Sequence, residues 1–188
     1  MADTSAMLQE QARQYAFEVH ASQSWAGHPY TEHLRRVHAL CQELELGTEI
    51  CTAAWLHDCL EDSDKAVSEH IQELQERFGL AVVELVFAVS GFGSRRTERC
   101  LDIVGKLWKI VRQSEISDFP TGVAAVNLKM ADRWVNWHMS QQGIDTLSGK
   151  LCKLYLLEFQ EHYRALLPYA HPELQRRLLE LEKAQSFS

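Results

Sequence analysis

The chain has 188 residues, of which 46% are hydrophobic and 24% charged, and its formal net charge is −7 at pH 7. A chain of this size and composition buries a core of its own, which excludes a disordered or fibrous protein. The negative charge argues against binding to a nucleic-acid backbone or an anionic membrane, whereas a local group of cations or a bound metal would still admit an anionic small molecule. The first residues lack the basic and apolar parts of a signal peptide, and no apolar run reaches the roughly 20 residues that span a bilayer. We therefore expect a cytoplasmic protein that binds neither nucleic acid nor membranes.

Hydrophobic residues recur at steps of three and four along almost the whole chain, which is typical of amphipathic helices. We predict helices over about 5–22, 30–46, 49–60, 67–78, 80–89, 97–114, 120–139 and 149–167, and a last helix from 172 onward. Gly47 and Gly79 are predicted to end the second and fourth helices, and the Gly-rich stretch 90–94 is the clearest loop. The Val-rich segment 81–89 shows no alternation of period two, so we predict a helix there as well. These elements predict an all-α fold, with one domain of about eight to nine helices over residues 1–188.

The five cysteines have no metal-binding or redox spacing. They fall within helix-like patterns and form no CxxC pair, so we expect structural thiols in a reducing compartment. Their positions are Cys41, Cys51, Cys59, Cys100 and Cys152.

The third predicted helix, which is strongly apolar, ends in one imidazole and three carboxylates: His57, Asp58, Glu61 and Asp62. If the helix continues to about residue 60, spacings of three and four residues bring these side chains onto one face. Carboxylates so close to a core and to one another repel unless a cation or a proton neutralises them. The cluster therefore predicts a site for a divalent metal.

Two separate segments offer further metal ligands of the same kind. His33 lies in the first turns of the second predicted helix, and Asp132 lies on the seventh, with Asn136 one turn later. Two imidazole nitrogens and two carboxylate oxygens suit a transition metal such as Mn, Fe, Co or Zn.

The order of these residues resembles the H…HD…D signature of HD-superfamily hydrolases. The sequence segments around them resemble those of the RelA/SpoT-type and small alarmone hydrolases. The similar segments are Gly27–His28–Pro29–Tyr30 before His33, Ala53–Ala54–Trp55–Leu56–His57–Asp58–Cys59–Leu60–Glu61–Asp62, Phe78–Gly79 with Val83–Glu84–Leu85–Val86, and Lys129–Met130–Ala131–Asp132–Arg133–Trp134–Val135–Asn136. The resemblance covers about residues 20–167 and leaves a C-terminal helix over 168–188. It implies an enzyme that removes the 3′-pyrophosphate of a (p)ppGpp-type alarmone with Mn²⁺.

The resemblance also implies the roles of single residues. The metal ligands would be His33, His57, Asp58 and Asp132. Glu61 and Asp62 would act on the attacking water and the phosphate, and Asn136 would lie beside the nucleotide.

Other positions are candidate substrate contacts. The stretch 20–27 lacks the arginine that these hydrolases usually carry, so the base stays open between guanine and adenine, and Trp25 is a candidate to stack on it. Arg95 and Arg96, after the Gly-rich loop, and Lys106 are candidates to bind phosphate, because arginine and lysine pair well with phosphate oxygens. Tyr155 resembles a family tyrosine near the nucleotide.

Two alternatives remain. One is another HD-type nucleotide phosphohydrolase, such as a nucleotidase or an NADPH-phosphatase-like enzyme, which would release orthophosphate. The other is a nucleotide-binding module without turnover. The pair of Glu61 and Asp62 favours the alarmone hydrolase, and the oligomeric state stays open.

Overall fold

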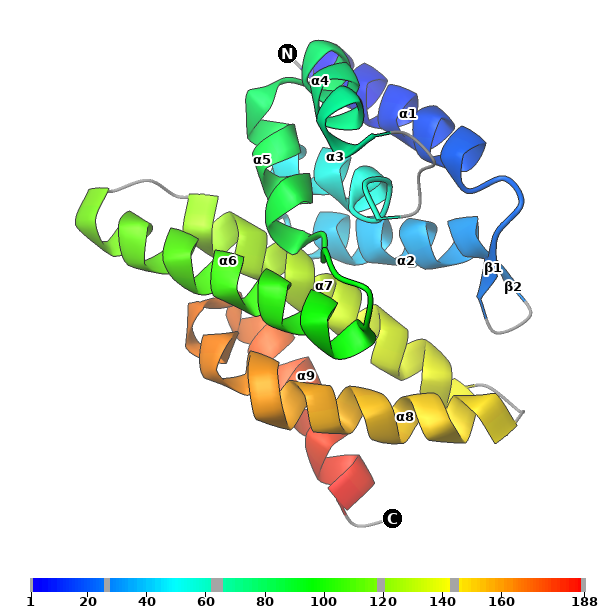
Figure 1. Ribbon diagram of the computed structural model, residues 1–188, viewed down its shortest axis with the longest axis vertical. Coiled ribbons are helices and arrows are strands. Elements are labelled where there is room, and N and C mark those ends of the chain that lie inside the picture. The colour runs from blue at the N-terminus through cyan, green and yellow to red at the C-terminus, as the bar shows by residue number, and fades with distance from the viewer. Residues whose placement is uncertain (1, 26–27, 62–65, 118–120, 143–145, 187–188) are drawn as a thin grey trace.

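The computed structural model describes residues 2–25, 28–61, 66–117, 121–142 and 146–186, and it confirms the all-α prediction (Figure 1). The described residues form nine α-helices: α1 (Ala2–Val19), α2 (Tyr30–Glu43), α3 (Thr48–Leu56), α4 (Val67–Phe78), α5 (Leu80–Val89), α6 (Arg96–Ser117), α7 (Thr121–Gln142), α8 (Thr146–Glu158) and α9 (Pro172–Ser186). The Val-rich segment is helical, as predicted, and α4 and α5 have the predicted bounds. None of the described helices has the length and apolar character needed to cross a bilayer.

Helix α7 lies at the centre of the molecule. Helices α1 to α5 form one group, α8 and α9 lie on the opposite side, and α6 and α7 cross between them (Figure 1). α7 contacts α2, α3, α5, α6, α8 and α9, and its side chains Leu128, Met130 and Trp137 are fully buried. A helix that is covered all round can hold charged groups only where each has a partner. The charged residues in the middle of α7 therefore mark a polar site inside the core.

The prediction that the third helix continues to residue 60 was wrong, because α3 ends at Leu56. The His57 carbonyl accepts a hydrogen bond from Ser90 Oγ at 3.3 Å. The chain then tightens into turns in which the amides of Cys59 and Glu61 bond to carbonyls three residues earlier. Consequently His57, Asp58 and Glu61 lie in the turns after α3 and not on one face of a continuous α-helix.

A short antiparallel pair, β1 (Ser24–Trp25) and β2 (His28–Pro29), precedes α2 and was not predicted. Two-residue strands carry no periodicity that a sequence can reveal. The Tyr30 amide bonds to the Gln23 carbonyl at 3.1 Å, which fixes the start of α2 beside this pair. The prediction that Gly47 ends the second helix was also wrong: α2 ends at Glu43, and Gly47, with φ of 98°, precedes α3.

The eighth predicted helix is correct only in its first part. α8 ends at Glu158 and is followed by a π-helical turn, η1 (Phe159–Tyr163), and a 3₁₀-helix, η2 (Arg164–Tyr169). A π-helical turn changes which side chains share a face, and such turns are common beside functional sites. Here it lies between Glu158 and Tyr163, which line the same cavity.

Candidate metal centre and active site

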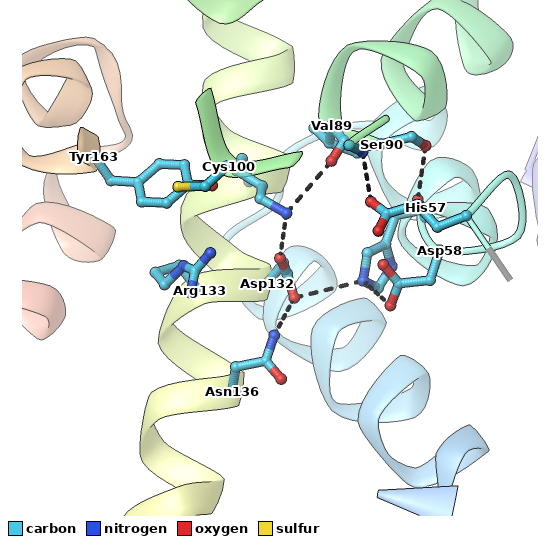
Figure 2. A network of polar contacts seen from close by, with 12 residues as sticks. His57, Asp58, Val89, Ser90, Cys100, Asp132, Arg133, Asn136 and Tyr163 are labelled. Atoms are coloured by element: carbon cyan, nitrogen blue, oxygen red, sulfur yellow. Dashed lines mark hydrogen bonds and ion pairs between the residues drawn. The ribbon is translucent and has the colours of Figure 1, made fainter. Parts of the chain in front are cut away.

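Four potential ligand atoms from three parts of the chain converge beside α7. His33 comes from α2, His57 and Asp58 follow α3, and Asp132 lies on α7; the last three are seen in Figure 2. The two Nε2 atoms of His33 and His57 are 3.2 Å apart. Asp58 Oδ2 lies 3.0 Å from His57 Nε2 and 3.5 Å from His33 Nε2. Asp132 Oδ1 lies 3.3 Å from His33 Nε2 and 3.6 Å from His57 Nε2.

These separations fit a common metal ion. Nitrogen and oxygen ligands about 2.1 Å from one ion lie roughly 3.0 to 3.4 Å from each other, according to the coordination geometry. The separations of 3.0 to 3.6 Å from the two imidazole nitrogens to each other and to the two carboxylates are close to this range. Two imidazole nitrogens that face each other among carboxylates need a shared cation or proton between them. The donor set therefore fits a divalent transition metal.

Neighbouring groups orient three of the four candidate ligands, His57, Asp58 and Asp132. The Nδ1–H of His57 donates to the Ala54 carbonyl at 2.9 Å, which leaves the Nε2 lone pair for a metal. The Tyr30 hydroxyl donates to Asp58 Oδ2 at 2.6 Å. Asp132 accepts a hydrogen bond from Asn136 Nδ2 at 2.5 Å on Oδ1 and pairs with Lys129 Nζ at 2.8 Å through Oδ2 (Figure 2). Such second contacts are typical of built metal sites.

The electrostatics of the cluster also favour a cation. Burial would lower the pKa of the His57 imidazole, but Asp58 and Asp132 outweigh it and raise the pKa well above its usual value. Burial would likewise raise the pKa of the Asp132 carboxyl, but the Lys129 charge and the two imidazoles hold this pKa well below its usual range. The carboxyl groups of Asp58 and Asp132 thus stay ionised. They present negative charge to the point where the four side chains meet.

Glu61 lies at the same cavity and is held by the loop after α5. Its Oε1 accepts a hydrogen bond of 2.6 Å from the Gly91 amide. The side chain keeps one side open to solvent, yet the protein around its carboxyl and the Asp58 charge raise its pKa above the usual value. A carboxylate of raised basicity is suited to accept a proton from a water molecule. Its predicted partner, Asp62, lies outside the described residues.

An open cavity of about 180 Å³ connects this cluster to a second charged region. Near the metal ligands it is lined by three carboxylates, Asp58, Glu61 and Asp132, and one ammonium group, that of Lys129. The remaining charged lining residues are Arg96, Arg99, Arg133 and Glu158. The cavity is therefore acidic at one end and basic at the other.

The structure brings three of the predicted substrate contacts to this cavity: Arg96, Asn136 and Tyr155 line it. Lys106 and Arg95 are not among its lining residues. Lys106 Nζ pairs with Asp102 at 2.8 Å, and the Arg95 side chain is 81% exposed. The Trp25 side chain lies outside the part of the structure that can be described. All of these assignments stay predictions.

Sequence reasoning missed several residues that line the cavity, among them Tyr30, Lys129, Arg133 and Glu158. Lys129 and Arg133 carried a signal, because they are charged residues in an otherwise apolar helix next to Asp132. Arg133 and Glu158 are 25 residues apart in the sequence, so no local sequence pattern could predict their contact.

A family model of the HD domain matches residues 12–136, and the chain belongs to this family. The matched range includes all four residues of the metal cluster. The guanosine-3′,5′-bis(diphosphate) 3′-pyrophosphohydrolase of Aquifex aeolicus (strain VF5) is 38% identical over 85 residues, which are 45% of this chain and 12% of that protein. The match thus spans a small part of that relative's length. A solved structure described as "A metazoan ortholog of SpoT hydrolyzes ppGpp and plays a role in starvation responses" covers 95% of each chain with a TM-score of 0.75 and 20% identity, so the two folds are alike.

Proposed function

We propose that this protein is a metal-dependent hydrolase that removes the 3′-pyrophosphate of a ppGpp-type alarmone and releases pyrophosphate. The observation that carries the proposal is the convergence of four side chains: the imidazole nitrogens of His33 and His57 lie 3.0 to 3.6 Å from carboxylate oxygens of Asp58 and Asp132, beside a cavity that Glu61 also lines. The name of the Aquifex relative and the description of the metazoan structure support this substrate class.

In the proposed reaction His33, His57, Asp58 and Asp132 would hold a divalent metal, which would supply Lewis-acid chemistry to the phosphate and the attacking water. Glu61 accepts the proton of that water, since its carboxylate faces the same cavity and the Gly91 amide fixes one of its oxygens. Lys129 and Asn136 keep Asp132 in its orientation. Asp62 is proposed, from the family resemblance, to protonate the leaving oxygen.

Three finer points are part of the proposal. The metal is Mn²⁺, as the resemblance to alarmone hydrolases implies, and the protein acts in the cytoplasm. The base is guanine or adenine, since the arginine usual before the G-x-P-Y segment of these hydrolases is missing. Trp25 is proposed to stack on that base.

The test is incubation of Mn²⁺-loaded protein with ppGpp, pppGpp, ppApp, NADPH and 5′-nucleoside monophosphates, followed by chromatography of the products. Release of pyrophosphate from a 3′-pyrophosphorylated nucleotide supports the proposal, and comparison of the guanine and adenine substrates gives the base preference. Release of orthophosphate alone would indicate another HD-type phosphohydrolase. Turnover of none of these nucleotides by metal-loaded protein would contradict the proposed activity.

A further inference from the structure

The segment that directly follows α5 fixes the proposed general base. The Gly91 amide donates to Glu61 Oε1 at 2.6 Å. The hydroxyl of Ser90 contacts the carbonyl of Val86 at 2.8 Å and that of His57 at 3.3 Å, and the second of these contacts is seen in Figure 2. The main chain of Ser90 and Gly91 is therefore held between the end of α5 and the turns that carry Glu61.

A lysine side chain on α6 holds the other side of this segment. Lys106 Nζ donates to the Ser90 carbonyl at 2.5 Å and pairs with Asp102 Oδ2 at 2.8 Å. The same Asp102 oxygen accepts a hydrogen bond from the Phe92 amide at 3.0 Å. The ammonium group also lies over the rings of Phe87 and Phe92, at 4.7 Å and 4.6 Å from their centres. A carboxylate, a carbonyl and two aromatic rings thus determine its position.

One peptide unit joins Lys106 to Glu61. The Ser90 carbonyl and the Gly91 N–H belong to the same planar trans group, so these two bonds point in opposite directions. Lys106 binds the oxygen of this group, and Glu61 binds its hydrogen. A cation at the carbonyl polarises the peptide and strengthens the N–H as a donor, because hydrogen bonds in a chain reinforce one another. The charge of Lys106 therefore acts on the Glu61 carboxylate from the far side of this peptide.

Lys106 does not line the cavity, unlike the second lysine at the end of α5. That second lysine, Lys129, contacts the Val89 carbonyl at 3.4 Å, pairs with Asp132 at 2.8 Å and lines the cavity. Cations are favourable beside the carbonyls that end a helix, and both lysines stabilise the end of α5 in this way. We therefore expect Lys106 to affect the reaction only through the main chain that it binds.

We propose that Lys106 is a positioning residue for hydrolysis, which holds the Ser90–Gly91 peptide so that its N–H fixes the Glu61 carboxylate. This inference rests on the proposed function, in which Glu61 accepts the proton of the attacking water, and it adds a residue outside the cavity to that mechanism. Without the ammonium group the peptide is free to rotate and to turn its N–H away from Glu61. A carboxylate without a fixed orientation accepts the proton less efficiently, because proton transfer depends on geometry.

The kinetic test is Lys106→Met, which removes the charge and keeps a long apolar side chain. We expect kcat for ppGpp to fall about tenfold, as for loss of a charge-assisted hydrogen bond, while KM and the Mn²⁺ affinity measured by calorimetry stay close to those of the wild type. Lys106→Arg, which keeps the charge, should recover part of the loss. Lys109→Met is the matched control, because it removes an exposed ammonium group of α6 that does not line the cavity, and its kcat should be unchanged. A normal kcat of Lys106→Met would overturn the proposal.

A double-mutant cycle separates positioning from a general structural role. In the Glu61→Gln background, Lys106→Met should reduce the remaining activity by less than about twofold, because the group that Lys106 positions has already lost its function. Loss of stability, or loss of a direct contact with phosphate, would reduce the activity by the same factor in both backgrounds. Equal losses in the two backgrounds would therefore overturn the proposal.

An NMR experiment tests the contact without turnover. In metal-free, isotope-labelled protein the bond to Glu61 moves the Gly91 amide proton to lower field, and Glu61→Ala gives its position without that bond. We expect Lys106→Met to shift this resonance toward its position in Glu61→Ala and Lys109→Met to leave it in place, and the remaining amide resonances report whether each variant keeps its fold.

The outcome of this experiment is independent of the proposed activity. An unshifted Gly91 resonance in folded Lys106→Met would overturn the positioning role even if alarmone hydrolysis is observed. A shifted resonance in a protein that hydrolyses no alarmone would support the action of Lys106 on the Glu61 contact and contradict the proposed function alone.

Discussion

The hydroxyl of Tyr30 lies 2.6 Å from Asp58 Oδ2, so a residue at the start of α2 orients a proposed metal ligand that follows α3. The Tyr30 ring is itself held between His20, on which it stacks at 4.8 Å, and the edge of His33 at 5.6 Å. Tyr30 is thus a positioning residue for both ligand segments.

Removal of this hydroxyl should weaken metal binding. Loss of a partner behind a metal ligand typically lowers affinity about 10- to 100-fold. We expect Tyr30→Phe to bind Mn²⁺ at least about tenfold more weakly in calorimetry, while the fold is retained because the ring stays in place. Tyr169→Phe, in η2 and away from the cluster, is the control. Equal affinity of Tyr30→Phe and the wild type would show that the hydroxyl does not orient Asp58.

Asp132 links the metal cluster to the core, and its replacement should have two separable effects. Asp132→Asn should abolish the rise in Tm that Mn²⁺ gives the wild type, because a ligand of the native state is lost. It should also destabilise the metal-free protein by about 3 kcal/mol, since the buried Lys129 would lose its negative partner. Thermal and urea unfolding, each with Mn²⁺ and with EDTA, measure both effects. A normal metal-induced rise in Tm would exclude Asp132 from the ligand set.

Glu61→Gln separates catalysis from metal binding. The amide keeps the size of the side chain but cannot accept the proton of the attacking water. We expect hydrolysis to fall about 100-fold or more, consistent with loss of a general base, with Mn²⁺ affinity close to that of the wild type. Steady-state kinetics and calorimetry on the same preparation provide the comparison. Full activity would remove Glu61 from the mechanism.

Gly91 permits the close approach of the loop after α5 to α6. A Cβ atom at this position would lie 2.7 Å from Arg99 Cβ and 2.8 Å from its carbonyl oxygen. Gly91→Ala should therefore destabilise the protein by about 1 to 3 kcal/mol through overpacking and displace the amide that holds Glu61. Gly105→Ala, within α6, is the control, because its added methyl group would meet nothing within 4 Å. That variant should be neutral or slightly more stable in urea unfolding.

His38 should make the protein less stable in acid. Burial lowers the pKa of its imidazole to about 4 in the folded protein, where its ring stacks on Trp55. Between about pH 6.5 and pH 4 the unfolded chain therefore binds this proton more readily than the folded chain, and stability falls as the pH falls. His38→Gln keeps a donor for Gln9 without the titration. The loss of unfolding free energy from pH 7 to pH 4.5 should be smaller for this variant, and an equal loss would contradict the assignment.

The sequence predicted the helices, and it also singled out the four residues that the structure brings together as candidate metal ligands, because both leave local patterns in the sequence. The helices follow from the spacing of the apolar residues. His33, the His57–Asp58 pair and Asp132 lie in short segments that resemble family motifs. The end of α3 at Leu56 left no such mark, and the Ser90 hydroxyl that contacts the next carbonyl, that of His57, comes from 33 residues away.

The basic end of the cavity was only partly predictable for the same physical reason. Arg96 was a candidate because it follows a Gly-rich loop, but its contact with Glu158 spans 62 residues. The π-helical turn after Glu158 reflects packing against η2 and α6, which propensity does not describe. The predicted site thus differs from the observed one in two respects: contacts between residues far apart in the sequence, and irregular turns at helix ends.

Adjacent residues of α7 serve the two ends of the cavity: Asp132 belongs to the metal cluster, and Arg133 to the arginine network that it forms with Arg96 around Glu158. Neighbouring side chains on a helix diverge by about 100° from Cα atoms about 3.8 Å apart. The placement of the carboxylate cluster relative to the arginine network is thus constrained by two neighbouring positions on one buried helix. Because α7 is buried, the distance between the two charged ends of the cavity varies little. A ligand that is too short or too long for this distance would leave one end of the cavity unfilled.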